Sequence, residues 1–249
     1  MPFCIVTQSL QAPHLNICRD AIAITVVASL TASLCAGLFL WQHFIHYGLS
    51  VSAKGRNLFF SGHKKQGAEA GAAIKQTLAM GISSADDLLS GKPISIPMVA
   101  IIDPYVAGFI TSLSVISMSY VYKGANWNNK KRTEFLMECW KVVGLSTENC
   151  HVYARVMGDP AAEAVWDKDG QYSKGSEAAF LSFGAAYGIL NAEDLQSDII
   201  QTAQQKAAQM MGIDKDLGFE AGDNAALGAA VSELTIQKHM KKHYSGSLI

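Results

Sequence analysis

The amino-acid sequence predicts an all-α membrane protein, with a two-span transmembrane hairpin followed by a C-terminal soluble domain of five or six helices. Three observations predict this fold class. The run from 21 to 42 holds no charged residue, and a second stretch, from 94 to 122, is nearly as poor in charge. After Trp127 the composition becomes that of a soluble helical domain, without an alternating strand pattern of useful length. Only 16% of all residues are charged, against about 25% in a typical soluble domain.

The first span is the apolar run Ala21–Gln42. A helix of this length covers roughly 30 Å, which is the thickness of the hydrocarbon core of a bilayer. Trp41 lies at its end, where amphipathic rings prefer the membrane interface. A cleaved signal peptide is the competing interpretation, but Arg19 is the only basic residue before the run and no small-x-small site closes it. We therefore expect the helix to be retained as an anchor.

Small residues form two rows at four-residue spacing on this predicted helix. The rows are Ala28, Ala32 and Ala36, and Ser29, Ser33 and Gly37. Such rows let another helix approach closely enough for backbones to touch. Gly67 and Gly71 repeat the spacing in a predicted helix from about 62 to 80. We expect these eight residues to form helix-packing interfaces, with the second span or with another protein.

The second span is predicted from Pro104 to Tyr122. Asp103 and Pro104 are typical of a helix start, as an N-cap followed by proline at the first helical position. The helix would be roughly 28 Å long, with Tyr105 near one end and Tyr120 near the other. Asp103 would then lie at the membrane interface. A buried core helix of a globular domain is the alternative for this stretch.

The basic residues near the two spans favour an orientation with both termini, and thus the C-terminal domain, on the cytoplasmic side. The outer flanks hold Arg19, Lys123, Lys130, Lys131 and Arg132, and the connecting loop holds Lys54, Arg56 and Lys92. Extending the window to Lys64, Lys65 and Lys75 removes the difference. We expect the membrane to be a bacterial inner membrane or the inner membrane of an organelle.

The chain is predicted to divide into four segments. These are a tail with the first span (1–48), an Ala/Gly-rich helical loop (49–93), the second span (94–126) and the soluble domain (127–249). In the loop, Ser84 reads as the cap of a short helix. In the soluble domain we expect helices over 132–144, from the cap Ser146 to about 157, and from Asp159 and Pro160 to about 166. A central buried helix capped by Ser176 follows, and then a long amphipathic helix from Asn191 with Leu195, Ile199, Ala203 and Ala207 on one stripe. Asp223 or Asn224 opens the last helix, in which Leu227, Val231 and Leu234 face inward and 238–243 form a basic end.

No catalytic, cofactor-binding or metal-ligating residue is assigned from the sequence. His239 and His243 share a helical face, but two histidines alone do not make a metal site. His43 and His46, close together on one span, could not take opposite faces of a haem. Cys139 and Cys150 flank a turn and are expected to be buried thiols, although a bridge is the alternative.

The segment from Asp167 to Gly170 resembles part of a calcium loop, but its register places Val165 and Ser176 where carboxylates are needed. A turn followed by a helix cap is the better interpretation. The run from 169 to 195 resembles the acidic turn and following helix of tellurite-resistance-B-like helical domains, without a motif from which a function follows.

The preferred hypothesis is a non-catalytic membrane-embedded subunit or scaffold of a larger complex, in secretion machinery or in an energy-converting assembly. Its partners would be the lipid bilayer and other membrane-protein subunits; the net charge of −1 gives no reason to expect nucleic acid. The alternative is a membrane-tethered enzyme or ligand-binding protein, with His151, Asp167 and Asp169 contributing to a pocket. A small transport or channel component is a weaker third, because two spans offer only serines and threonines as polar lining.

Overall fold

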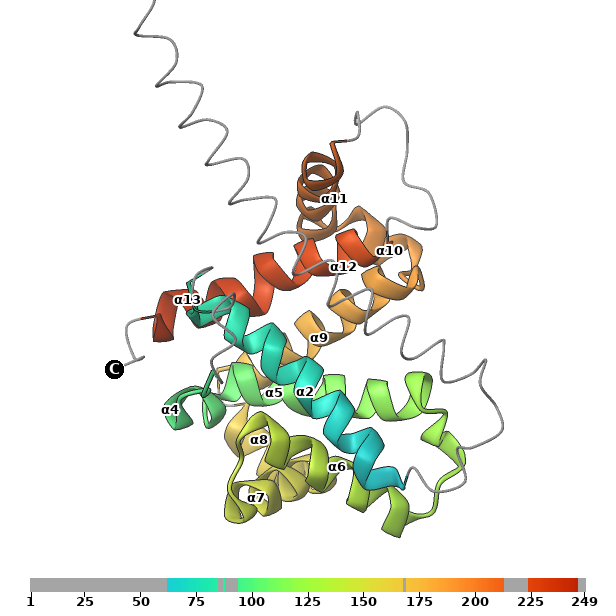
Figure 1. Cartoon of the computed structure of the whole chain (residues 1–249), viewed down its shortest axis with the longest axis vertical. Coiled ribbons are helices and arrows are strands. Elements are labelled where there is room, and N and C mark those ends of the chain that lie inside the picture. The colour runs from blue at the N-terminus through green and yellow to red at the C-terminus, as the bar shows by residue number, and fades with distance from the viewer. Residues whose placement is uncertain (1–61, 85–86, 88–93, 168, 213–223, 246–249) are drawn as a thin grey trace, which may run out of the picture. The chain divides into compact units, whose positions relative to one another are not determined.

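The computed structural model describes residues 62–84, 87, 94–167, 169–212 and 224–245. The chain divides into two compact units, Met1–Gly37 and Leu38–Ile249, and all of the described residues belong to the second. The predicted span Ala21–Gln42 and its two rows of small residues lie outside the described residues. Across the described ranges every regular element is a helix, which confirms the all-α class (Figure 1).

The described helices differ widely in length. In chain order they are α2 (His63–Ile82), α4 (Met98–Ile101), α5 (Pro104–Ile116) with its π-helical extension η2 (Ser117–Val121), η3 (Gly124–Asn126), α6 (Asn129–Val143), α7 (Thr147–Gly158), α8 (Pro160–Trp166), α9 (Gln171–Tyr187), α10 (Ala192–Gln196), α11 (Asp198–Met211), α12 (Asn224–Ser232), the π-helical η5 (Glu233–Gln237) and α13 (Lys238–Tyr244).

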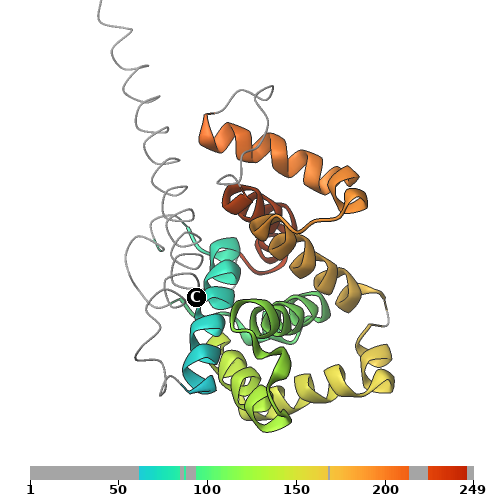
Figure 2. The same ribbon diagram turned by 90° about the vertical axis from the view of Figure 1, so that its right-hand side faces the viewer.

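Helix α5 lies at the centre of the larger group of helices. It contacts α9 most extensively, and also α2, α6 and α7 (Figures 1 and 2). The crossing with α9 brings backbone against backbone: a Cβ at Gly108 would lie 2.1 Å from the carbonyl oxygen of Tyr172, and one at Gly175 would lie 1.9 Å from that of Tyr105. Only glycine fits at these two positions, because any side chain would separate the helices.

The stretch Pro104–Val121 is long and apolar enough to cross a membrane, and it is the one such helix among the described residues. However, 56% of it is buried inside the protein. Its neighbour α6 carries six charged residues (Lys130, Lys131, Arg132, Glu134, Glu138 and Lys141), and charged helices do not lie in hydrocarbon without cost. The two-span hairpin is therefore not confirmed, and the packing favours the alternative, a core helix of a helical domain.

Helix α2, which the sequence assigned to a connecting loop, packs along α6. Gly67 faces Phe135 and Gly71 faces Cys139, and a Cβ on either glycine would lie 2.3 Å from the opposing carbonyl oxygen. Both pairs are four residues apart, so one turn of α2 matches one turn of α6. Close approach of α2 thus takes place within this chain.

Most of the predicted helix starts are confirmed. Asp103, Ser146, Asp159 and Asn191 each accept a hydrogen bond from the backbone of the following first turn. Ser84 exchanges hydrogen bonds with Asp87 in the manner of a capping box. These caps could be read from the sequence because each is a local interaction.

Two predicted helices begin or end elsewhere. Ser176 is not a cap: α9 begins at Gln171 after Gly170, and the hydroxyl of Ser176 instead accepts a hydrogen bond from Ser112 of α5. The long helix expected from Asn191 is broken at Ser197, whose extended backbone ends α10 and whose side chain caps α11. The soluble part consequently holds more and shorter helices than the five or six expected.

The break at Ser197 rotates the apolar stripe of α11. Ile200, Ala203 and Ala207 are buried, whereas Leu195 and Ile199, predicted to face inward, are exposed. The buried stripe packs on α12, where Leu227 and Val231 point inward as expected. Among the described residues this small cluster is one of two hydrophobic cores; the larger includes residues of α5 together with Trp140 and Tyr153.

Candidate functional site

Asp103 occupies the junction between α4 and α5. It directly follows the exposed Ile102 and precedes Pro104, and its Oδ1 accepts a hydrogen bond of 3.1 Å from the backbone N–H of Val106. This is the N-cap geometry expected from the sequence. The cap also holds the carboxylate at one end of α5, where a second helix reaches it.

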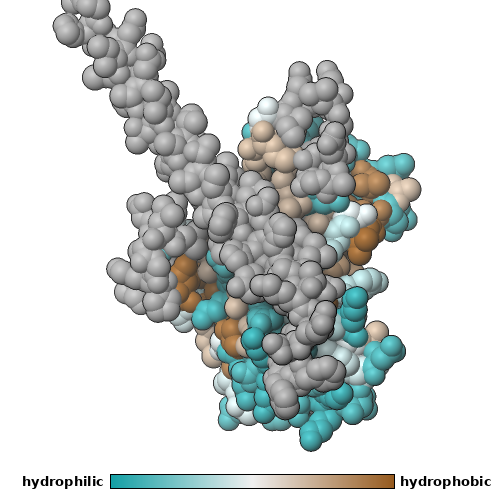
Figure 3. Space-filling view, turned by 45° about the vertical axis from the view of Figure 1, so that its right-hand side comes forward, coloured by the Kyte–Doolittle hydropathy of each residue, from teal (hydrophilic) through white to brown (hydrophobic). Residues whose placement is uncertain are grey.

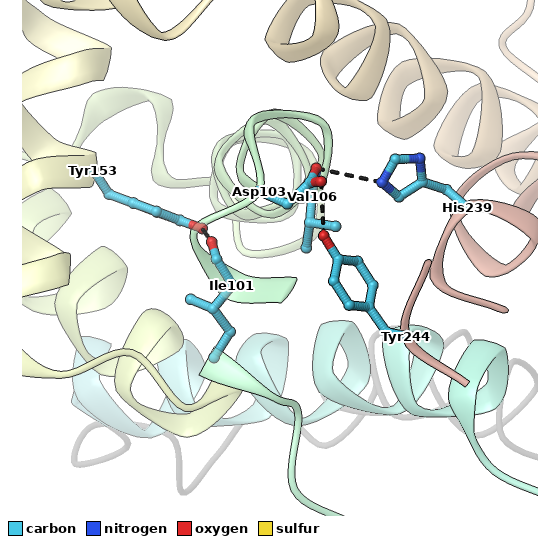
Figure 4. Close-up of polar contacts among 6 residues, drawn as sticks. All are labelled: Ile101, Asp103, Val106, Tyr153, His239 and Tyr244. Atoms are coloured by element: carbon cyan, nitrogen blue, oxygen red, sulfur yellow. Dashed lines mark hydrogen bonds and ion pairs between the residues drawn. The ribbon is translucent and has the colours of Figure 1, made fainter. Parts of the chain in front are cut away.

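That second helix is α13, near the C-terminal end of the described chain. The hydroxyl of Tyr244 donates a hydrogen bond of 2.8 Å to Asp103 Oδ2. Nε2 of His239 lies 3.3 Å from Oδ1, an ion-pair distance, but its direction does not meet hydrogen-bond geometry (Figure 4). The imidazole ring also stacks on Tyr105, with ring centroids 4.3 Å apart and an interplanar angle of 16°. We call this arrangement the Asp103 junction.

The charge of Asp103 is stabilised in this setting. Burial alone would raise the pKa of the carboxyl, but its contacts with His239, Tyr244 and the N–H of Val106 outweigh burial and lower the pKa to about 2. Burial, followed by the nearby carboxylate, raises the pKa of Tyr244 above its usual range. At neutral pH the junction therefore holds a carboxylate and an un-ionised tyrosine.

This chemistry suits helix docking better than catalysis. An Asp–His pair acts in nucleophilic catalysis when the imidazole activates a hydroxyl or thiol. Here the hydroxyl at the junction is that of Tyr244, which donates to the carboxylate itself. The part of the chain that the structure describes contains no group of three or more His, Cys, Asp or Glu residues that could hold a metal ion.

Two exposed surfaces flank the Asp103 junction. Helix α4 and the residue that follows it expose Met98, Val99 and Ile102, which are 46%, 57% and 50% accessible; we call these residues the α4 apolar face. Helix α13 exposes Lys238, Lys241 and Lys242, which we call the lysine face. Their spacing of three and four residues places the three ammonium groups on one side of the helix.

A separate aromatic surface lies where η2 meets α9. Tyr120 and Phe180 are 65% and 60% exposed. The ring of Tyr120 contacts that of Phe183 at 5.8 Å, and Phe183 stacks on Tyr187 at 4.2 Å. We call these four residues the aromatic face. The space-filling view also shows hydrophobic residues at the surface among hydrophilic ones (Figure 3).

Polar groups inside the domain bond to one another across helices. The hydroxyl of Thr111 lies 2.8 Å from that of Tyr172, which joins α5 to α9. Ser114 lies 3.3 Å from Cys139 Sγ and accepts a hydrogen bond of 3.2 Å from the indole N–H of Trp140, which joins α5 to α6. These contacts give hydroxyl, thiol and indole groups a structural role.

The candidate residues from the sequence are placed as follows. Cys139 and Cys150 are free, buried thiols, as expected, and the structure contains no disulfide between them. Asp167 accepts hydrogen bonds from the backbone and hydroxyl of Ser173, which agrees with a turn that leads into a helix. His151 and Asp169 are exposed. His43 and His46 lie outside the described residues.

The sequence analysis identified single residues of the Asp103 junction but did not predict that they contact one another. Asp103 was recognised as a cap, and His239 with His243 as a helical pair. The pairing of Asp103 with His239 and Tyr244 is long-range, and a single sequence carries no signal for it. The rings of His239 and His243 do lie together, with centroids 4.6 Å apart. However, His239 contacts Asp103 and Tyr105 as well.

No protein-family model, no curated protein and no solved structure matches this chain.

Proposed function

We propose that this protein is a non-catalytic, membrane-anchored subunit or scaffold of a larger membrane complex, such as secretion machinery or an energy-converting assembly. The anchor is the apolar run Ala21–Gln42, in a bacterial or organelle inner membrane, and the helical domain lies on the cytoplasmic side. The domain contacts a neighbouring subunit of the complex through the aromatic face.

The aromatic face is the observation that carries the proposal. Apolar residues scattered singly on a surface are ordinary. Here Tyr120 and Phe180 come from different helices and are both exposed, and the ring of Tyr120 contacts the buried Phe183, which stacks on Tyr187. Aromatic side chains held in place by their neighbours are enriched among the residues that dominate binding energy at protein interfaces. The rigid backing reduces the entropy lost when a partner binds.

The interior polar contacts also support a non-catalytic role. Thr111 bonds with Tyr172, and Ser114 bonds with Cys139 and Trp140. These contacts join helices, and none of them includes a carboxylate or an imidazole that could act as a general base. The site that gathers ionisable groups, the Asp103 junction, fastens α13 to the start of α5. Together these contacts make the domain a stable frame for an interaction surface.

In this proposal only the run from 21 to 42 crosses the bilayer, and α5 is the core helix of the domain. A hairpin in which α5 also crosses is the competing arrangement. It would require α5 to leave its contacts with α9 and α6, including the crossing at Gly108 and Gly175. The cost of breaking that packing favours a single span.

The experiment compares the size of the assembly before and after the aromatic face is altered. The full-length protein is extracted from its native membrane in a mild detergent and sized on a native gel, and co-migrating subunits are identified by mass spectrometry. The variant Tyr120→Ser/Phe180→Ser should release the protein from the assembly. Val165→Ser removes an exposed apolar residue of α8, away from the aromatic face, and should leave the assembly intact.

A wild-type protein that migrates as a monomer without partners would overturn the proposal. A double variant that stays in the assembly would remove the aromatic face as the contact. A metal or small molecule retained by the purified protein in native mass spectrometry would instead favour the tethered enzyme or ligand-binding protein.

A further inference from the structure

We propose that the α4 apolar face and the lysine face together form a second membrane contact, which rests on the surface of an anionic bilayer beside the anchor. Met98, Val99 and Ile102 would enter the headgroup region, and Lys238, Lys241 and Lys242 would bind lipid phosphates. The inference deepens the proposed function and rests on it, because the anchor is what brings the domain to the bilayer.

The shape of α4 suits shallow insertion. Its four residues divide between two environments: Ala100 and Ile101 are buried against the domain, while Met98 and Val99 face outward together with Ile102, which ends the turn. The segment is far too short to span, but its exposed apolar side chains can enter the headgroup region. Surface-bound segments insert about 5–10 Å in this way.

The lysine face supplies the matching charge. Helix α13 contains no acidic residue, and its lysines lie on the side of the helix away from the buried Met240. Lysines near an anionic leaflet are attracted by its negative surface potential. The carboxylate nearest to these cations in the junction is Asp103, which is engaged by His239 and Tyr244 and so does not compete for them.

The Asp103 junction joins the two elements that carry these faces. Asp103 directly follows Ile102 of the α4 apolar face in the chain. Its carboxylate contacts His239 (Figure 4), which lies between Lys238 and the other two lysines in the sequence of α13. Apolar side chains next to a row of cations are the pattern that distinguishes a membrane-surface contact from a protein interface, whose centre is depleted of lysine.

The anchor makes such a weak contact effective. Three partly exposed apolar side chains and three lysines would give a free domain only modest affinity for a bilayer. Once a span tethers the domain, binding becomes intramolecular and the effective lipid concentration is high. The contact would then fix which way the helical domain, and with it the aromatic face, is turned at the membrane.

The test measures how close residue 99 comes to lipid in the full-length protein. Wild type, Val99→Trp and Val165→Trp are reconstituted into vesicles of phosphatidylglycerol and phosphatidylcholine that contain brominated acyl chains. The four native tryptophans give a background that the wild type measures. The added fluorescence of Val99→Trp should be quenched by at least about twofold more than that of Val165→Trp.

The charge requirement is tested in the same vesicles. Adding Lys238→Gln/Lys241→Gln/Lys242→Gln to Val99→Trp should remove most of the extra quenching, and so should vesicles of phosphatidylcholine alone. A matched control, Lys130→Gln/Lys131→Gln/Lys141→Gln, removes three exposed lysines of α6. Added to Val99→Trp, it should leave the extra quenching unchanged. Equal quenching at residues 99 and 165 would overturn the inference. So would extra quenching at residue 99 that is unchanged by the lysine substitutions and by the removal of anionic lipid.

Extraction with alkaline carbonate separates this inference from the proposed function. A protein that leaves the membrane in carbonate has no anchor, and the proposed function fails. Preferential quenching at residue 99 in vesicles to which that protein is added would still support the surface contact. An anchored protein without this quenching overturns the surface contact alone.

Discussion

The hydroxyl of Tyr244 donates a hydrogen bond of 2.8 Å to the carboxylate of Asp103, 141 positions earlier in the chain. The same carboxylate caps α5 through the N–H of Val106 and pairs with His239. One side chain therefore both starts the core helix and fastens α13 to it. This double role allows the cap and the charge to be separated by mutation.

Asp103→Asn should keep the cap and lose the charge. Asparagine caps helices about as well as aspartate, so the contact with Val106 should persist. The attraction to His239 and the charged acceptor of Tyr244 are lost, and we expect the free energy of unfolding to fall by roughly 1–2 kcal/mol for a half-buried pair of this kind. Denaturant unfolding of the full-length protein in mild detergent, followed by near-UV circular dichroism, measures the change.

The control is Asp159→Asn at the start of α8. Asp159 is also an N-cap, and its side chain pairs with the exposed Arg155 at 3.7 Å. We expect a change of less than about 0.5 kcal/mol, because exposed pairs contribute little. An equal loss in both variants would show that the Asp103 junction contributes no more than an ordinary cap.

The low pKa of Asp103 predicts how stability depends on pH. In the folded protein the pKa is about 2, below the value of 3.8 for an unperturbed aspartate. A group whose pKa is lowered by folding stabilises the fold above its unfolded value, and that stabilisation is lost as the pH falls towards the folded value. The difference in unfolding free energy between wild type and Asp103→Asn should thus shrink as the pH falls between about pH 4 and pH 2.

Unfolding curves of both proteins across this pH range measure the effect. Protonation of other carboxylates destabilises both proteins alike and cancels in the difference. A difference that stays constant down to pH 2 would contradict the lowered pKa.

Local chemistry explains which parts of the fold were predictable. The helix starts at Asp103, Ser146 and Asp159 were predictable from the sequence, because each side chain caps an N–H only two or three residues away. The break at Ser197 could not be read in the same way, since an amphipathic pattern continues through it. There the packing of Ile200 on α12 overrides the simpler continuous helix.

Hydropathy could not separate a membrane span from a core helix at α5. Both need a long apolar run, and the difference lies in what surrounds it. The glycine crossing of Gly108 with α9 and the charged neighbour α6 are facts of tertiary structure. For the same reason the sequence did not predict the α4 apolar face. It lies within the same apolar stretch, and Val99 is exposed one residue before the buried Ala100.

Gly71→Ala should destabilise the domain although alanine is the better helix former. The added methyl group would meet the carbonyl oxygen of Cys139 at 2.3 Å, and backbone atoms cannot move aside as a flexible side chain can. Separation of α2 from α6 should cost roughly 1–3 kcal/mol, more than the ~1 kcal/mol that alanine gains over glycine in a helix. Thermal and denaturant unfolding measure the net effect.

Gly158→Ala is the matched control, because Gly158 lies in α7 with no atom within 4 Å of an added Cβ. This variant should be neutral or more stable by up to ~1 kcal/mol. If Gly71→Ala behaved in the same way, the close approach of α2 to α6 would be contradicted.

The two described cysteines should be unreactive until the protein unfolds. Cys139 is fully buried, and burial raises the pKa of its thiol to about 12; burial also raises the pKa of Cys150. Because the thiolate is the reactive form, a maleimide should not modify either residue in the native protein at pH 7. The measurement uses a variant in which the other three cysteines are replaced by serine, with thiols counted by mass spectrometry before and after denaturation.

The same variant with Ala164→Cys provides the control, since Ala164 lies on the exposed face of α8. This third thiol should react at once in the native protein, while Cys139 and Cys150 should react only in denaturant. Rapid native labelling of Cys139 would mean that α6 separates readily from α5, since Ser114 of α5 shields that sulfur at 3.3 Å. Fewer than two reactive thiols after denaturation without reductant would show that Cys139 and Cys150 are bridged, which requires the domain to face an oxidising compartment and would contradict its proposed cytoplasmic placement.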